Sequence, residues 1–148
     1  MLFLLCVFIL LKNTVSHEEK LYFIVELIDS LKYMFREIRF FKNYFLDFYS
    51  EQTTDVQQKI EFVLDLIRHI EAVPRKFLKK IENSKGLFEI RVKVKSNIYR
   101  IFCFFDEEQL VILINGFQKK TQKLPRKEIL KAEKLKKEYF LEKGRSNE

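Results

Sequence analysis

The sequence predicts an α+β domain: an antiparallel sheet of about four strands, with N-terminal helices packed on one face and a basic helix at the C-terminal end. Residues 88–95 alternate between apolar and charged side chains, as in a half-buried strand. Residues 98–105 are almost all apolar, which is typical of a strand covered on both faces. Between residues 54 and 73, apolar residues recur every three or four positions and indicate an amphipathic helix.

Further elements are expected before the alternating strand. Residues 35–41 alternate in the same way and predict a first strand, and residues 43–51 predict a short aromatic helix. The amphipathic helix begins near Thr54 and runs to about residue 73, because Pro74 cannot continue a helix. Residues 75–81 are predicted to add one or two basic helical turns.

The C-terminal part contains one more strand and a long helix. Residues 110–114 predict a buried strand, and Asn115-Gly116 a bend at its end. Pro125 suits the first position of a helix that runs to about Lys143 and ends at Gly144. The apolar side of this helix comprises Ile129, Ala132, Leu135 and Tyr139.

The first 33 residues differ from the rest. Residues 1–11 are continuously apolar, but a membrane-spanning helix needs about 20 residues, and no basic residue precedes the run as in a secretory signal. Residues 1–33 carry 3 basic and 4 acidic side chains, a net charge of 3 − 4 = −1, and the change at Met34 is abrupt. We therefore expect an N-terminal extension at 1–33, a domain at 34–148 and a true start at Met34. The alternative is that residues 21–31 pack as an extra helix.

Charge and cysteine content limit the class of function. The chain has 28 Lys and Arg against 21 Asp and Glu, so its net charge is +7, which favours a polyanionic or acidic protein partner. Three glycines argue against a glycine-rich phosphate loop, and Cys6 and Cys103 have neither zinc-ligand nor disulfide spacing. We expect a cytoplasmic protein with no metal ion, no cofactor and no membrane attachment.

Basic side chains follow the charged side of the predicted sheet. Arg91, Lys93 and Lys95 project in a row beside Glu89 from one strand. Arg100 interrupts the next, mostly apolar strand, where a charge needs a partner or a function. Lys119 and Lys120 follow the last strand. In an antiparallel sheet these residues can converge on one side, although a solvated lysine-rich strand face is the alternative interpretation.

Such a cluster suits RNA cleavage by the substrate's own 2′-hydroxyl, a reaction that needs oriented phosphate, charge stabilisation and two proton transfers. Arginine holds phosphate oxygens bidentately, and lysine supplies a point charge or a proton. Phe117 or Tyr99 can stack on an unpaired base, and core packing is the alternative for both.

Three blocks now make a specific combination: residues 86–91 (Gly-Leu-Phe-Glu-Ile-Arg), 97–102 (Asn-Ile-Tyr-Arg-Ile-Phe) and 115–123 (Asn-Gly-Phe-Gln-Lys-Lys-Thr-Gln-Lys), with Pro125 after the last. In order and spacing they resemble the phage-derived Gp49-like branch of the HigB toxins in the RelE/ParE superfamily. The resemblance covers residues 35–143 approximately and leaves residues 1–33 outside.

The resemblance implies a RelE-like fold and a ribosome-dependent endoribonuclease that cuts mRNA. It also implies a HigA-like helix-turn-helix antitoxin, with operator DNA bound only through the complex of toxin and antitoxin. Arg91 and Arg100 match arginines that bind phosphate and stabilise charge, and Lys119 and Lys120 match a basic pair that binds phosphate or transfers protons. The expected RNA contacts are Lys93, Tyr99, Phe117 and Lys123. The chain offers no matching histidine, so the general acid and base stay open.

Three other interpretations remain open on sequence. A ParE-like protein of the same fold would inhibit DNA gyrase without cutting RNA, but it needs no cluster of arginines and lysines. A non-enzymatic module would use the basic surface only for binding. A membrane-associated protein would sediment with membranes through residues 1–11.

Overall fold

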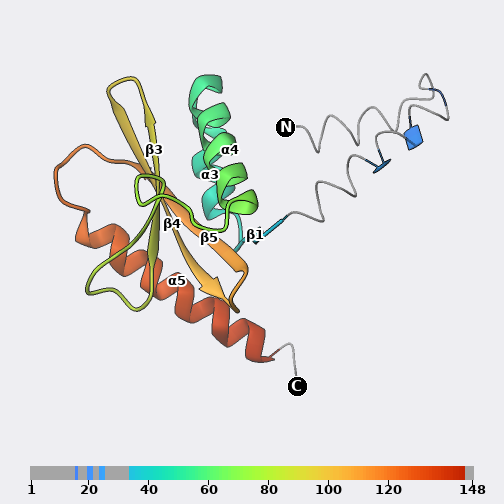
Figure 1. Ribbon diagram of the computed structural model, residues 1–148. Coiled ribbons are helices and arrows are strands. Elements are labelled where there is room, and N and C mark those ends of the chain that lie inside the picture. Colours follow the sequence, from blue (N-terminus) through green and yellow to red (C-terminus); the bar gives the residue numbers. More distant parts are fainter. Residues whose placement is uncertain (1–15, 17–19, 22–23, 26–33, 146–148) are drawn as a thin grey trace. The chain divides into compact units, whose positions relative to one another are not determined.

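The computed structural model describes residues 16, 20–21, 24–25 and 34–145 (Figure 1). The chain divides into two compact units, residues 1–34 and residues 35–148. In the first unit, Lys20, Leu21, Ile24 and Val25 are helical. The apolar run at 1–11 lies outside the described residues, as does most of the segment 21–31, and the start at Met34 stays a prediction. Among the helices described, none combines the length and apolarity needed to cross a membrane.

The second unit is α+β, and its sheet has five strands rather than the predicted four. The strands are β1 (Glu37–Phe40), β2 (Leu78–Lys80), β3 (Phe88–Val94), β4 (Asn97–Asp106) and β5 (Leu110–Gln118). They lie in the order β1-β5-β4-β3-β2. The prediction of a purely antiparallel sheet was wrong, because β1 pairs with β5 in parallel while all other neighbours are antiparallel. Two helices and three strands separate β1 from β5 along the chain, so no tight turn forces the pair to be antiparallel.

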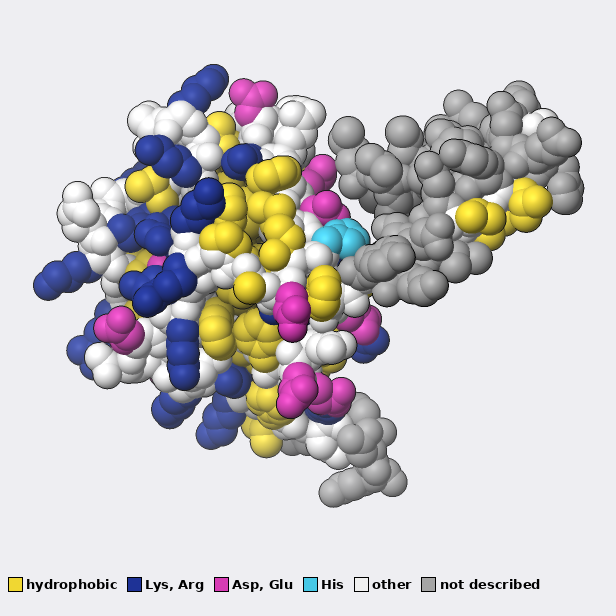
Figure 2. Space-filling model, in the orientation of Figure 1, with side chains coloured by type: hydrophobic (Ala, Val, Ile, Leu, Met, Phe, Trp, Pro, Cys, Tyr) yellow, Lys and Arg dark blue, Asp and Glu magenta, His cyan; other side chains and the backbone are white. Residues whose placement is uncertain are grey.

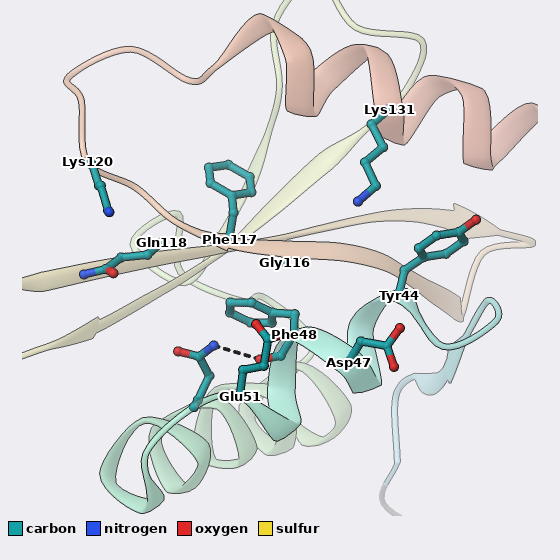
Figure 3. A pocket seen from close by; sticks show the side chains of 10 residues that line it. Tyr44, Asp47, Phe48, Glu51, Gly116, Phe117, Gln118, Lys120 and Lys131 are labelled. Atoms are coloured by element: carbon teal, nitrogen blue, oxygen red, sulfur yellow. Dashed lines mark hydrogen bonds between the residues drawn. The ribbon is translucent and has the colours of Figure 1, made fainter.

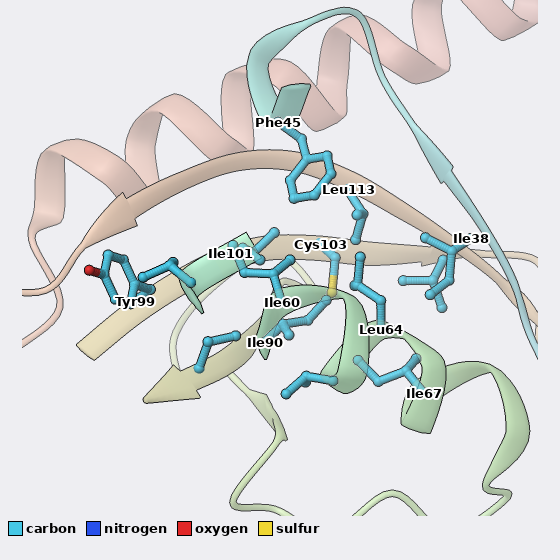
Figure 4. Packing of buried hydrophobic residues seen from close by; sticks show 14 residues of the cluster. Ile38, Phe45, Ile60, Leu64, Ile67, Ile90, Tyr99, Ile101, Cys103 and Leu113 are labelled. Atoms are coloured by element: carbon cyan, nitrogen blue, oxygen red, sulfur yellow. The ribbon is translucent and has the colours of Figure 1, made fainter. Parts of the chain in front are cut away.

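Helices cover both faces of the sheet. The early helices α3 (Tyr44–Ser50) and α4 (Thr54–His69) pack on one face, as predicted, and bury Phe45, Ile60 and Ile67 against Ile90, Ile101 and Leu113 (Figure 4). The C-terminal helix α5 (Arg126–Arg145) packs on the other face. Its predicted apolar side is confirmed: Ile129, Ala132, Leu135 and Tyr139 all join the second core cluster. The helix continues through Gly144, so that residue does not end it.

Helix α4 ends at His69, four residues before the predicted end. The C-cap residue Ile70 has an extended backbone, and the segment that leads into β1 binds this end of the helix. The Arg36 guanidinium donates to the carbonyl oxygens of Ile67, Ile70 and Glu71 at 3.1, 2.7 and 2.6 Å. A helix leaves its last four carbonyls without internal partners. Arg36 therefore binds one of these four carbonyls, that of Ile67, and two carbonyls just beyond the helix, and so attaches α4 to the start of the sheet.

Two further local predictions were wrong. Residues 75–81 contain strand β2 instead of the predicted helical turns. The backbone of Leu78–Lys80 pairs with β3, and a strand of three residues is too short to show a period in the sequence. Strand β5 continues through Asn115 and Gly116, where a bend was predicted. The register shifts here, between Ile101 and Cys103 of β4, so the extra residue forms a β-bulge rather than a turn. Gly116 lies directly beneath the Phe48 ring of α3, where a Cβ would overlap it.

The described cysteine behaves as an inert core residue. The Cys103 side chain is fully buried and free, and burial raises the pKa of its thiol far above the ordinary value.

Candidate functional site

The register of the sheet places several of the predicted residues on the face that carries α5. Arg91 of β3 lies opposite Arg100 of β4, and Arg100 lies opposite Phe117 of β5. The adjacent row begins with Lys93, which lies opposite Ile98. Because side chains alternate along a strand, both rows point to the same face as the α5 core cluster.

Lys119 extends the second row by one residue beyond β5. Its backbone N–H donates to the carbonyl of Ile98 at 2.7 Å, so the ladder continues past Gln118. Its ammonium donates to the carbonyl of Gln122 in the loop that leads into α5. Lys119 therefore lies on the same face as Lys93, and Ile98 of β4 lies between the two lysines.

A buried carboxylate joins the two arginines. Glu89 Oε2 accepts a hydrogen bond from Arg100 Nε at 2.9 Å, and Glu89 Oε1 lies 3.5 Å from Arg91 Nε. The Glu89 and Arg100 residues are only 6% and 5% exposed. Burial lowers the pKa of Arg100 and the neighbouring charge of Arg91 acts in the same direction, whereas Glu89 opposes both. One carboxylate therefore serves two guanidiniums, and the group keeps a net positive charge.

The two arginines have different access to a ligand. Arg100 is enclosed, and its Nη1 donates to the carbonyl of Tyr99 at 3.0 Å. The Arg91 side chain is 37% exposed, and its Nη1 is 3.5 Å from the carbonyl of Arg75. Arg91 Nε is buried without a hydrogen bond of good geometry. Arg91 is therefore the guanidinium that an external phosphate can reach, and the buried Glu89 carboxylate lies behind it within ion-pair distance.

Lysines surround this group. Lys79 of β2 lies opposite Glu89 and extends its row to the sheet edge. Lys93 is exposed and Lys119 is partly exposed. Figure 2 shows Lys and Arg side chains gathered on the side where Figure 1 places the β3–β4 hairpin and the loop leading into α5. Between residues 119 and 127 the chain carries five basic residues and no acidic residue. We call Lys79, Arg91, Lys93 and Lys119 the basic sheet face.

Three predicted residues lie apart from this face. Tyr99 precedes Arg100 in the same strand, so it points to the opposite face, where it is 6% exposed in the core under α4 (Figure 4). Lys120 follows Lys119 and points toward the cleft beside α3 (Figure 3). Lys123 is exposed in the loop before α5.

Phe117 is half-buried. Its ring packs edge-to-face on Phe102 with centroids 5.2 Å apart, and it also lines the cleft beside α3. The Phe117 ring therefore packs in the core on one side and is accessible from the cleft on the other.

Sequence reasoning did not identify Glu89 and Lys79 as parts of the candidate site. Glu89 stood beside Arg91 in the alternating pattern, but its pairing with Arg100 depends on the β3–β4 register. The useful signal was an acidic residue on the same strand face as an arginine, next to a second arginine in an otherwise apolar strand. Lys79 carried no signal, because its segment was predicted as helix.

Comparison with known families places the chain. The family model of the phage-derived protein Gp49-like matches residues 47–137. This is 91 of 148 residues, more than half of the chain. The chain belongs to the Gp49-like family. That family is part of the RelE/HigB-like toxin group and is associated with the toxins of toxin–antitoxin systems.

The Gp49-like match extends from α3 into α5 and contains the whole basic sheet face together with Glu89 and Arg100. Strand β1, the end of α5 and residues 1–33 lie outside it. A search of curated proteins found no significant match.

Proposed function

We propose that this Gp49-like chain is the toxin of a type II toxin–antitoxin pair and cuts mRNA on the ribosome as an endoribonuclease. The family is linked to RelE-type toxins that are endoribonucleases, which supports the proposal. The observation that carries it is the Arg91 guanidinium, which is partly exposed on the basic sheet face and forms an ion pair with the buried carboxylate of Glu89 behind it.

The proposed reaction uses the RNA's own 2′-hydroxyl. This hydroxyl loses its proton and bonds to the adjacent phosphorus, while the bond from phosphorus to the 5′-oxygen breaks and that oxygen gains a proton. The products are a 2′,3′-cyclic phosphate and a 5′-hydroxyl. Arg91 binds the non-bridging oxygens, where negative charge grows in the transition state, and Lys93 adds a point charge. Within the predicted basic pair, Lys119 is the member on this face, and we assign it protonation of the 5′-oxygen.

Arg100 acts as a positioning residue in this scheme. It is too enclosed to contact RNA, but it fixes Glu89, which in turn faces Arg91. Pre-organised donors cost no reorganisation during the reaction, so a fixed guanidinium is worth more than a mobile one. Phe117 offers its exposed edge to a base, and Lys123 contacts the RNA backbone or the ribosome.

The partners follow from the same proposal. We propose a HigA-like helix-turn-helix antitoxin, a ribosome with its mRNA as target, and contact with operator DNA only through the antitoxin complex. We also propose that residues 34–148 are the toxin domain and that it acts in the cytoplasm. The basic charge of this domain suits both an RNA target and an acidic inhibitor.

Mapping of mRNA 5′ ends after induced expression tests the function. The wild-type chain is compared with Arg91→Ala and with Lys95→Ala, a control that removes one charge from an 82% exposed side chain at the hairpin tip. We expect new ends inside translated messages for the wild type and Lys95→Ala, and none for Arg91→Ala. Growth arrest without new ends would instead indicate the gyrase-inhibitor type, and no arrest would indicate a binding module.

A further inference from the structure

The side of β5 that faces β1 is paired over only about half of its length. β1 pairs with residues Leu110 to Leu113 of β5, and the last bond of this pair runs from the Phe41 N–H to the Leu113 carbonyl at 2.9 Å. The chain then turns away at Lys42, which has a φ of 54°, and enters α3. In the described part of the chain, no strand pairs with this edge of β5 beyond Leu113.

The free edge presents backbone hydrogen-bonding groups. Along a strand, successive residues direct their N–H and C=O groups to alternate sides. The Lys119 N–H donates to Ile98 of β4, so Phe117, two residues earlier, also faces β4. Gly116 and Gln118 therefore direct their backbone groups to the free edge. An unpaired edge of this kind is a template for another strand.

A cleft of about 510 Å³ lies along this edge, between α3 and α5 (Figure 3). Phe48 lines it from the α3 side of the sheet and Phe117 from the α5 side. The Lys131 ammonium of α5 lies 5.4 Å from the centre of the Tyr44 ring, so these two residues bring the walls together at one end. The cleft combines backbone donors and acceptors with an aromatic side chain on each face.

The two walls carry opposite charges. Asp47 and Glu51 line the α3 side, and Lys131 lines the α5 side. Lys120, just beyond β5, lines the end of the cleft away from Lys131. Side chains of a strand added to β5 would alternate between these walls. A segment with basic residues at every second position and acidic residues between them matches both walls at once. Along the α3 wall an RNA backbone is disfavoured, because its phosphates would lie beside two carboxylates.

We propose that the Gly116–Gln118 edge of β5 binds an extended segment of a protein partner, which adds a strand to the sheet and places basic side chains against α3 and acidic side chains against α5. Main-chain hydrogen bonds supply affinity in this mode of recognition, and the alternating side chains supply specificity. The cleft shares Phe117 with the proposed RNA contacts but does not include Arg91, and the proposal does not depend on the nuclease function.

Fluorescence anisotropy with labelled peptides tests the proposal on the full chain. The probe is Lys-Glu-Leu-Val-Lys-Glu, whose alternate positions carry one sign of charge. The control, Lys-Lys-Leu-Val-Glu-Glu, has the same composition but mixes both signs on each face in every register. We expect the alternating peptide to bind at least tenfold more tightly. Equal binding of the two peptides, or no binding of the alternating one, would overturn the proposal.

Two pairs of variants locate the binding. Asp47→Lys with Glu51→Lys makes both walls basic and should weaken the alternating peptide at least tenfold. Asp65→Lys with Glu108→Lys makes the same charge change at exposed positions elsewhere and should leave its affinity within threefold. Gln118→Pro removes an outward N–H, whereas Gln118→Ala keeps it, so only the proline variant should lose binding.

The alternative ligand has its own signature. Hexauridylate RNA that competes with the peptide, and binds more tightly after Asp47→Lys with Glu51→Lys, would assign the cleft to RNA and contradict the proposal. Equal affinity of the Gln118→Pro and Gln118→Ala variants for the peptide would show that no strand is added. These experiments measure peptide and RNA affinity and not nuclease activity. A negative result here therefore says nothing about the proposed function, and a negative cleavage result says nothing about this cleft.

Discussion

At the scale of single residues, the site depends on one buried carboxylate. Glu89 neutralises Arg100 inside the protein and at the same time faces the exposed Arg91. Removing one partner of a buried ion pair leaves an uncompensated charge, which costs far more than losing a surface pair. The same contact therefore connects stability with the geometry of the proposed phosphate site.

This leads to a prediction for Glu89→Gln. We expect the free energy of unfolding to fall by about 3–5 kcal/mol, because Arg100 stays buried without its counter-ion. Urea denaturation measures the loss. The matched control is Glu37→Gln, which breaks an ion pair with Arg39 between side chains 53% and 63% exposed and should have a much smaller effect. Equal losses in the two variants would contradict the importance of the buried pair.

Residue-level reasoning from sequence succeeded where a period of two was enough. Arg91, Lys93 and Lys95 were placed on one strand face because charged residues alternate with apolar ones, and the register bears this out for Arg91 and Lys93. Lys95 instead lies beyond the end of β3, where its backbone φ is 55° and its ammonium is 3.8 Å from Asp55 of α4. The same rule already implied that Tyr99 points away from Arg100 and that Lys120 points away from Lys119. The contact between Glu89 and Arg100 needed the pairing register, which a single sequence does not contain.

At the scale of elements, the packing of α3 on β5 depends on the absence of a side chain at Gly116. We expect Gly116→Ala to lower the free energy of unfolding by about 1–3 kcal/mol, because the added methyl overlaps the Phe48 ring. A double-mutant cycle with Phe48→Ala should show a smaller cost of the methyl when the ring is gone.

Gly144→Ala is the control for this prediction. A Cβ at Gly144 meets no atom within 4 Å, and the position is helical, so alanine there should stabilise the protein by up to about 1 kcal/mol. Similar losses from alanine at both glycines would contradict the steric explanation for Gly116.

The attachment of α5 to the end of β4 should depend on pH. Asp106 accepts hydrogen bonds from Tyr139 Oη at 2.6 Å and from Lys143 Nζ at 2.8 Å. Burial acts to raise the pKa of Asp106, but the bonds from Lys143 and Tyr139 outweigh it and hold the pKa below the ordinary 3.8. A depressed carboxyl pKa gives stability that is present above pH 3.8 and is lost as pH falls through the folded value.

We therefore expect Asp106→Asn to be less stable than the wild type at pH 7, with a difference that shrinks below about pH 4. Urea denaturation over a pH series measures it. Glu107→Gln, which removes a more exposed contact of the same Lys143, should show little pH-dependent difference. A gap between wild type and Asp106→Asn that stays constant down to pH 2 would exclude the linkage.

Elements were predictable from sequence when their patterns were long. Helices α4 and α5 show repeated apolar spacing, and β3 and β4 show clear strand patterns, so all four were expected. β2 has three residues, too few for any period, and only its pairing with β3 makes it a strand. Asn115-Gly116 has the composition of a turn, but the β4 ladder and Phe48 hold it inside β5.

At the scale of the whole molecule, charge is unevenly distributed. Helix α5 carries eight Lys and Arg against four Glu, and the loop before it adds three lysines. Helix α3, by contrast, carries an acidic residue, Asp47, and no basic one. A protein with one strongly basic side binds RNA with an affinity that falls steeply with salt.

We expect ribosome binding to show this dependence. Lys123→Gln with Lys127→Gln should reduce the slope of log affinity against log salt by about 2, one for each phosphate contact. The control, Lys59→Gln with Arg68→Gln, makes the same charge change on α4 and should leave the slope unaltered. Co-sedimentation with ribosomes at several salt concentrations gives both slopes, and identical slopes for all proteins would exclude a role for the loop and α5.

The central claim is that Arg91 serves RNA cleavage on the ribosome, and the most direct measurement is single-turnover cutting of a defined mRNA bound to purified ribosomes. We predict cutting of ribosome-bound mRNA but not free mRNA, with a 2′,3′-cyclic phosphate and a 5′-hydroxyl as products. Arg91→Ala should reduce the rate by about 100-fold or more, whereas Lys95→Ala should not change it. Equal rates for wild type and Arg91→Ala, or no cutting by folded wild-type protein, would contradict the account.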